Sequence, residues 1–373
     1  MTFELSILNI LILFGAFQGF LLSVILLTTK RLNKTSNRYL ALLLFALALL
    51  NLLSIMEMPP HRIYHEFIRY NPFFLVNLIP PSTYFFILYL TRPQYKWKSL
   101  DYLFFVPIML EMTLRFYKFS FYLRGDLLLD SEFEQFNLWI NTLELNAVVF
   151  TIIVLFWSIK SLKKYEIKLY ENYSEVKSHS LSWLRNVLIA GVALTALWLL
   201  VTLSDYSRST FSLELAIMTL LCLTFLIYWV GYSMIIRQEL LDTPIFAIAN
   251  QKHVSSETNE LSSKTDEYYH QLKKLMEDEK LYRDPNLNMT TLSEKTGLSN
   301  SYLSQIINQK DGRNFFDFIN EYRIEEVKEK MKDPNFDHYT ILAIAQDAGF
   351  KSKSTFNAFF KKSTGKTPSV FKN

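Results

Sequence analysis

Two stretches near the end of the chain decide its fold: LSEKTGLSNSYLSQIIN at residues 292–308 and LAIAQDAGFKSKSTFNAFF at residues 342–360. Each reads as a short helix, a turn with glycine, and a second helix with an adjacent apolar pair. This is the helix-turn-helix pattern. The two glycines, Gly297 and Gly349, lie 52 positions apart. Glycine suits such a turn because left-handed backbone costs other residues about 1–2 kcal/mol. One copy alone is also typical of an ordinary helical corner, but two copies favour a paired motif.

The segments around these two units read as further helices. Residues 265–281 have apolar positions at helical spacing, and the Asp-Pro-Asn that follows predicts their end. Residues 238–263 are polar and read as a linker. A charged amphipathic helix at 314–332 joins the two units. Its expected buried stripe is Phe315, Phe318, Ile319, Tyr322 and Val327.

The chain changes character near residue 237. Residues 1–236 carry 34 charged side chains, whereas the remaining 137 residues carry 40. A membrane helix needs about 20 mostly apolar residues. A buried soluble helix is the alternative for any one such stretch, but seven in succession are typical of a membrane protein. The predicted spans are residues 5–29, 39–58, 72–91, 100–119, 138–159, 183–204 and 211–236, the third interrupted by Pro80-Pro81.

The distribution of lysine and arginine predicts the orientation. Loops 30–38, 92–99 and 160–182 hold twelve of these residues, and the alternate loops hold six. Positive loops stay in the cytoplasm, so we expect the N-terminus outside and the C-terminal domain inside. The first span does not read as a cleavable signal, because its apolar run is long and no lysine or arginine precedes it.

Composition excludes several kinds of site. The single cysteine, Cys222, rules out a disulfide framework and a multi-cysteine zinc site. Six histidines without paired spacing give no metal-binding pattern. The chain has no HExxH, GxSxG, P-loop or glycine-rich nucleotide motif. We therefore expect no catalytic residues, no cofactor and no metal, and a protein that is not an enzyme.

Residues 265–373 resemble the C-terminal DNA-binding domain of AraC-type (AraC/XylS family) transcription regulators. The resemblance rests on stretches 292–308, 314–331 and 343–372. Ala358 departs from it, standing where many relatives carry an arginine on the second recognition helix. The complete layout resembles the membrane-tethered AraC-type regulators of some bacteria. The family's gapped pattern falls on Gly349, Phe350, Ser352, Ser354, Phe356, Phe360, Lys361, Gly365, Thr367 and Pro368.

These observations predict an all-α protein with a seven-span sensor domain at 1–237, a linker at 238–263 and a double helix-turn-helix domain at 264–373. Short polar side chains suit base edges in the major groove, and lysines suit phosphates. The resemblance implies that both recognition helices enter successive major grooves of one site. The groove-facing residues expected in the first unit are Asn300, Ser301, Ser304 and Gln305. In the second unit we expect Lys353, Ser354 and Asn357 at bases and Lys351, Ser352 and Lys361 at phosphates.

Ionisable residues inside membrane spans are costly and often functional. By the predicted topology four acidic residues lie toward the outer side. They form a hypothetical pocket for a polar or cationic extracytoplasmic ligand. The alternative is that Glu111 and Arg115 make a structural ion pair and the others are interfacial. The four residues are Glu57, Glu111, Glu144 and Glu214.

The function that these patterns favour is a transcription regulator in the cytoplasmic membrane. Its expected partners are double-stranded DNA and the lipid bilayer, with RNA polymerase and a second copy of the chain as further candidates. Three other interpretations stay open: a transporter or membrane enzyme with a regulatory tail, a protein whose tail binds other proteins, and a regulator released by cleavage in the 238–263 linker.

Overall fold

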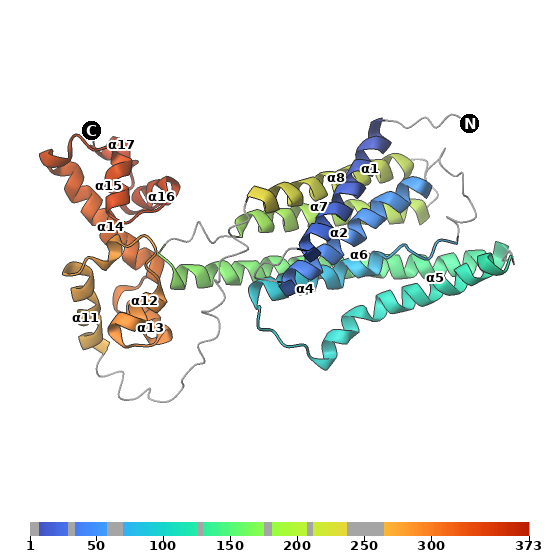
Figure 1. Cartoon of the computed structure of the whole chain (residues 1–373), viewed down its shortest axis with the longest axis horizontal. Helices are drawn as coiled ribbons and strands as arrows, with labels where there is room; N and C mark the ends of the chain where they lie inside the picture. The colour runs from blue at the N-terminus through green and yellow to red at the C-terminus, as the bar shows by residue number, and fades with distance from the viewer. Residues whose placement is uncertain are drawn as a thin grey trace. The chain divides into compact units, whose positions relative to one another are not determined.

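The computed structural model describes residues 7–28, 34–57, 70–125, 130–174, 181–206, 212–236 and 265–372. The chain divides into two compact units. The N-terminal unit is Met1–Leu162 with Ser182–Phe246, and the C-terminal unit is Lys163–Leu181 with Ala247–Asn373. Within the described ranges every named element is a helix (Figure 1), which confirms the predicted all-α class. The predicted linker at 238–263 lies outside the described residues.

Seven α-helices and two short 3-10 helices, η2 and η3, are described from the N-terminal part of the chain. The α-helices are α1 (Ile7–Thr28), α2 (Lys34–Glu57), α4 (Ile79–Thr91), α5 (Val106–Arg124), α6 (Asp130–Asn172), α7 (Ser182–Tyr206) and α8 (Ser212–Ile236). The 3-10 helices are η2 (Val76–Leu78) and η3 (Ser99–Phe105). Helix α6 is 43 residues long, so it extends well beyond the predicted span at 138–159, and its last residues belong to the C-terminal unit.

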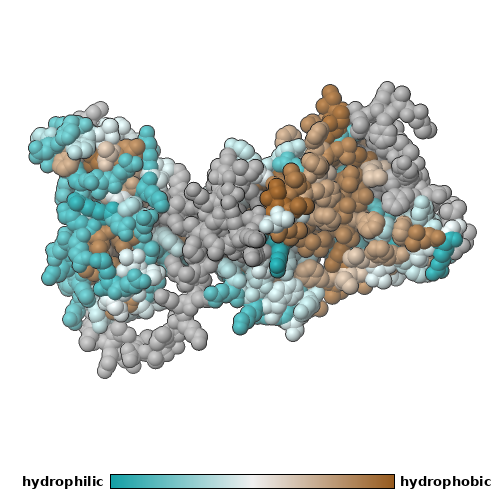
Figure 2. Space-filling model, in the orientation of Figure 1, coloured by the Kyte–Doolittle hydropathy of each residue, from teal (hydrophilic) through white to brown (hydrophobic). Residues whose placement is uncertain are grey.

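Five of the described helices, α1, α2, α6, α7 and α8, are long and apolar enough to cross a membrane. Large apolar side chains on this unit face outward: Phe17 is 65% exposed and Phe225 is 73% exposed. Figure 2 shows this hydrophobic surface, which contrasts with the hydrophilic surface of the C-terminal unit. A continuous apolar surface of this kind suits lipid rather than water.

The predicted third and fourth spans differ from the structure. The third, 72–91, contains the short 3-10 helix η2 and the 13-residue helix α4. Pro80 and Pro81 lie in its first turn instead of interrupting a span, because proline lacks an N–H and the first N–H groups of a helix have no partner in it. The fourth, 100–119, begins as η3 and continues as α5, which carries four charged side chains. The count of seven spans is therefore not confirmed.

Close packing in the N-terminal unit depends on small residues. Helix α1 packs against α2 and α8. A Cβ atom on Gly19 would lie 2.8 Å from the Cβ of Ala48, and one on Gly231 would lie 2.8 Å from Leu22 Cδ1. Small residues let helix backbones approach closely and are frequent at interfaces between membrane helices.

The C-terminal unit contains seven further α-helices among the residues described. They are α11 (Thr265–Glu277), α12 (Met289–Thr296), α13 (Asn300–Asp311), α14 (Phe315–Lys332), α15 (Ile341–Asp347), α16 (Lys353–Thr364) and α17 (Pro368–Lys372). Two 3-10 helices, η6 (Leu281–Arg283) and η7 (Pro334–Phe336), lie between them. The predicted helix at 265–281 thus ends earlier, at Glu277.

Helix α14 connects two small cores. On one side, Leu272, Leu292, Leu303 and Phe318 are among the buried side chains packed together from α11, α12, α13 and α14. On the other side, α14 contacts α15 and α16, where the ring of Phe356 packs at a steep angle against those of Phe350 and Phe360. The predicted stripe of α14 is confirmed: four of its five residues are at most 1% exposed, and Tyr322 is partly buried.

Candidate nucleic-acid interface

The predicted first helix-turn-helix unit falls on α12 and α13, and local side chains fix both helix starts. Asn288 Oδ1 accepts a hydrogen bond from the Thr291 amide at 3.0 Å. Ser299 Oγ accepts one from the Tyr302 amide at 3.3 Å. These caps satisfy amides that a helix start leaves unpaired. Gly297 ends α12 with φ at +71°, the left-handed conformation that the sequence predicts.

Helix α13 has a buried face and an exposed face. Its fully buried side chains are Leu303, Ile306 and Ile307. The opposite face carries Ser301 and Gln305, both exposed, and Ser304, which is half-buried. Asn308, three residues after Gln305, is also exposed on this face. This face is open to a ligand along most of the helix.

Asn300 differs from its predicted position in the groove. Its side chain is 7% exposed and donates from Nδ2 to Thr290 Oγ1 at 3.4 Å. Asn300 is the first residue of α13, and side chains on a helix lean toward its N-terminus, so this one turns toward α12. Its role is therefore to join the two helices of the unit.

The predicted second helix-turn-helix unit falls on α15 and α16, whose starts are capped in the same way as those of α12 and α13. Thr340 Oγ1 accepts from the Ala343 amide at 3.1 Å at the start of α15. Ser352 Oγ accepts from the Thr355 amide, also at 3.1 Å, at the start of α16. Gly349 lies between the helices with φ at +98°. Ser352, predicted to bind phosphate, is thus the half-buried cap of α16.

Helix α16 presents four of the predicted residues on one face. Its apolar side carries Phe356, Phe359 and Phe360, which are all buried. Its exposed side carries Lys353, Ser354, Asn357 and Lys361. Lys351, just before the helix, is also exposed, and its ammonium donates to Asn286 Oδ1 at 3.3 Å. The face combines two cations with short polar groups, which is the composition that suits a DNA groove.

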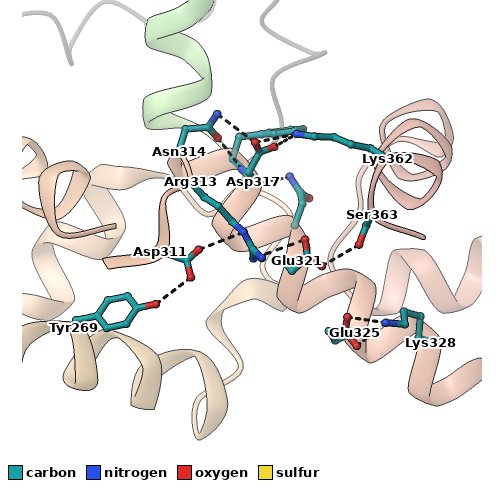
Figure 3. A network of polar contacts seen from close by, with 12 residues as sticks. Tyr269, Asp311, Arg313, Asn314, Asp317, Glu321, Glu325, Lys328, Lys362 and Ser363 are labelled. Atoms are coloured by element: carbon teal, nitrogen blue, oxygen red, sulfur yellow. Dashed lines mark hydrogen bonds and ion pairs between the residues drawn. The ribbon is translucent and has the colours of Figure 1, made fainter. Parts of the chain in front are cut away.

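Polar contacts hold α16 on α14 (Figure 3). The Lys362 ammonium lies 2.8 and 2.9 Å from the two carboxylate oxygens of Asp317. Ser363 Oγ donates to Glu321 at 2.9 Å. Asp317 and Glu321 are one turn apart on α14, so they hold the end of α16 at two successive turns.

The same network continues to the first unit. Arg313, just after α13, lies 3.5 Å from Asp311 and 3.7 Å from Glu321. Tyr269 on α11 donates to Asp311 at 3.1 Å. Figure 3 shows that these side chains form one connected set along α14. The network therefore links α11, the end of α13 and α16 through a single helix.

A second ionic cluster lies on another part of α14. Arg283 donates twice to the Glu326 carboxylate, at 2.9 and 2.6 Å. Lys330 pairs with both Glu326 and Asp347, the last residue of α15. Burial raises the pKa of Glu326, but the hydrogen bonds from Arg283 and Lys330 outweigh burial and hold that pKa at about 2, below the ordinary value of 4.5.

The lowered pKa predicts acid sensitivity. A carboxylate whose folded pKa lies below its unfolded value stabilises the fold above the unfolded value and loses that contribution as pH falls. For Glu326 the loss falls between pH 4.5 and about 2. We expect the protection of α14 amides against hydrogen exchange, corrected for intrinsic rates, to fall across this window.

The variants Glu326→Gln and Glu329→Gln separate this effect from general acid unfolding. Glu329 is exposed on the same helix. Glu326→Gln is expected to lower stability at pH 7 and flatten the change below pH 4.5, whereas Glu329→Gln keeps the wild-type profile. The same profile in both variants would contradict the assignment.

The structure brings together two of the four glutamates predicted to form a ligand pocket. Arg115 donates to Glu111 at 3.1 Å and to Glu144 at 2.7 Å. Asn77 Nδ2 donates to the other Glu111 oxygen at 2.9 Å. Arg115 compensates both carboxylates, so these contacts favour the structural ion pair. Glu214 is exposed in the first turn of α8.

The side chain of Glu57 lies outside the described part of the structure. The ligand role of the four glutamates stays a prediction. In the described ranges, no group of three histidine, cysteine, aspartate or glutamate side chains could hold a metal ion.

The N-terminal unit also holds an apolar cavity of about 100 Å³. Residues of α2, α4, α6, α7 and α8 line it, and none of the four glutamates is among them. Its polar lining includes Thr83, Thr151 and Thr195, whose hydroxyls each donate to a carbonyl of their own helix. The Trp183 indole N–H, also of a lining residue, is buried and has no hydrogen-bond partner in the structure.

Comparison with known proteins finds similarity in the C-terminal unit. Residues 292–373 match the family model described as a helix-turn-helix domain. The C-terminal unit carries a helix-turn-helix domain. Over 113 residues the chain is 32% identical to uncharacterized HTH-type transcriptional regulators of Staphylococcus aureus strains COL and MSSA476. That match covers 28% of this chain but only 15% of each relative.

Another relative is matched over most of its own length. Over 92 residues the chain is 28% identical to the probable transcription factor PqrA of Proteus vulgaris. The match covers 25% of this chain and 73% of that protein. No solved structure matches the chain. The match to the helix-turn-helix family model thus lies within the C-terminal unit.

Proposed function

We propose that this chain is a membrane-bound bacterial transcription regulator that reads specific double-stranded DNA with α13 and α16. A signal sensed by the N-terminal unit controls it. The observation that carries the proposal is the pair of capped helix-turn-helix units on α14, each with an exposed polar face. Similarity to helix-turn-helix transcription regulators supports the DNA-binding role, and the five apolar helices support membrane attachment.

The exposed side chains suit two kinds of DNA contact, those to bases and those to phosphates. The amides of Gln305 and Asn357 can each donate and accept, which suits bidentate pairing with adenine in the major groove. Lys353 and Lys361 lie one turn from Asn357 on either side and suit phosphates that flank a base contact. The ionic bracing along α14 holds the two reading helices for one composite site. A homodimer and RNA polymerase would be further partners of this arrangement.

The membrane part of the proposal follows from loop charge. The N-terminus lies outside, and the C-terminal unit lies in the cytoplasm, where DNA is. An accessible cysteine tag at each end, probed on intact cells with a membrane-impermeant reagent in a Cys222→Ser background, tests this orientation. Labelling of the C-terminal tag from outside would contradict it.

The amide side chains give the sharpest test of sequence reading. The full chain in lipid nanodiscs is used to select duplexes from a random pool, and affinity is then measured by fluorescence anisotropy. Gln305→Ala or Asn357→Ala is expected to lose about 1–3 kcal/mol, roughly 5- to 150-fold, at one base position. The matched control is Gln271→Ala, an exposed amide on α11. A wild-type chain that enriches no sequence would contradict the proposed function.

The lysines predict a change in salt dependence without a change in preferred sequence. Each phosphate contact contributes about 0.9 to the slope of log affinity against log salt. We expect Lys353→Ala and Lys361→Ala each to reduce the slope by about that amount and to weaken all duplexes alike. Lys332→Ala, at the exposed end of α14, serves as the control for charge alone. If the wild type and all three variants showed the same salt slope, Lys353 and Lys361 would not contact DNA phosphates.

A further inference from the structure

The end of α6 is built into the C-terminal unit. Residues Lys163–Leu181 cluster with this unit and not with the rest of α6. The ring of Tyr170 packs edge-on against Phe316 of α14, with centroids 5.1 Å apart. In Figure 3 the last turns of α6, in green, lie beside the start of α14. We call residues 169–174 the α6 strap.

Ser174 anchors the strap through all of its polar groups. Its carbonyl accepts from Asn320 Nδ2 at 3.1 Å and from Arg323 Nη1 at 3.3 Å. Its hydroxyl donates to the Leu287 carbonyl at 2.6 Å and accepts from Arg323 Nη2 at 3.1 Å. Its amide donates to Leu287 at 3.3 Å. Ser174, Asn320 and Arg323 are all fully buried, so these bonds are shielded from competing water.

The strap contacts the start of α12 directly and α16 through one intervening side chain. Leu287 directly precedes Asn288, the cap of α12, and Tyr173 forms a β-bridge with Asn288. Phe316, against which Tyr170 packs, also packs edge-on against Phe359 of α16, with ring centroids 5.8 Å apart. One short segment thus contacts the start of the first unit directly and reaches the second recognition helix through one ring.

We propose that the α6 strap is an intramolecular docking element that sets DNA affinity. Seated on Leu287, Phe316, Asn320 and Arg323, it holds the start of α12 against α14 and so keeps α13 and α16 in the spacing of one DNA site. A pre-organised pair pays less ordering cost on binding. Release of the strap lowers affinity without changing which bases are read.

This regulation rests on the proposed function. It also supplies a route for the signal, because α6 is one of the helices apolar enough to cross a membrane and is continuous up to the strap. A ligand that favours one position of α6 shifts the balance between seated and released strap by its difference in affinity for the two states.

Tyr170→Ala tests the strap without opening the core. Tyr170 is 41% exposed, so its truncation leaves little buried space. In full-length protein in nanodiscs, we expect the Kd for the selected duplex to rise roughly ten-fold, as pre-organisation is lost. The preferred sequence stays the same, and amides of α14 exchange faster. Lys168→Ala, exposed on the same helix, is the matched control and is expected to bind as wild type does.

Ser174→Ala and the double variant complete the test. Both single changes act on one strap, so their combined effect on Kd should equal the larger single effect and not the product. Multiplicative effects, or a wild-type Kd in Tyr170→Ala, would overturn the strap while leaving DNA reading intact. A wild-type chain without any sequence preference would instead mean that the proposed function itself fails.

Discussion

Arg323→Met is expected to unfold the C-terminal unit or to leave it marginally stable. Arg323 is fully buried. Its guanidinium donates to the carbonyls of Tyr282 at 2.7 Å, Asp284 at 2.8 Å and Ser174 at 3.3 Å, and to the Asn320 side chain at 3.2 Å. Methionine fills similar space but donates nothing. The buried acceptors then lose their partners, which we expect to cost about 3–5 kcal/mol.

The size of that loss decides the outcome, because a domain of this kind has only about 5–15 kcal/mol of stability in total. Hydrogen exchange of α14 amides in the full-length protein measures it. Arg313→Met is the matched control: Arg313 is half-exposed and makes longer ion pairs, at 3.5 and 3.7 Å. We expect the control to cost under about 1 kcal/mol. Equal protection in both variants would show that the buried guanidinium has no special role.

Gly349→Ala is expected to have an effect of similar size through backbone geometry. Gly349 has φ at +98°, where a side chain is strained. A Cβ there would lie 2.4 Å from the Tyr282 carbonyl oxygen and 2.8 Å from that of Arg283. Both obstacles are backbone atoms, so a rotamer change cannot relieve the overlap. Strain of about 1–2 kcal/mol and overpacking of about 1–3 kcal/mol add to roughly 2–5 kcal/mol.

Gly297→Ala separates the two contributions. Gly297 has φ at +71°, but no atom lies within 4 Å of the position its Cβ would take. Its replacement should therefore cost only the backbone strain, about 1–2 kcal/mol. Urea-dependent hydrogen exchange of α14 and α16 compares the two variants. If Gly297→Ala destabilised as much as Gly349→Ala, the close approach to Tyr282 would not matter.

Much of the C-terminal unit was readable from the sequence, because its signals are local. A cap, a glycine at a left-handed turn and apolar residues at helical spacing act within a few positions of one another. The stripe of α14 and the buried pairs Ile306/Ile307 and Phe359/Phe360 follow from that spacing alone. Asn300 was misplaced because the first residue of a helix leans back toward the preceding helix, a direction that spacing does not show.

The N-terminal unit was readable only in part. Hydropathy located five apolar helices but assigned spans to α4 and α5 as well. A window average does not register that η3 replaces the start of the predicted span at 100–119, or that Glu111 and Arg115 inside that span form an ion pair. A window average also does not show that Glu144, 29 residues beyond Arg115, accepts a hydrogen bond from the Arg115 guanidinium.

The sequence by itself determined that the chain is helical, that an apolar half precedes a charged half, and that one long helix joins two segments of short helices. Short-range periodicity and capping suffice for these features. Only the tertiary structure decided that Ser174, 146 positions before Asn320, belongs to the C-terminal unit. A buried serine carries no pattern in the chain. Its role arises because hydrogen bonds in a folded core join groups by position in space and not by order in sequence.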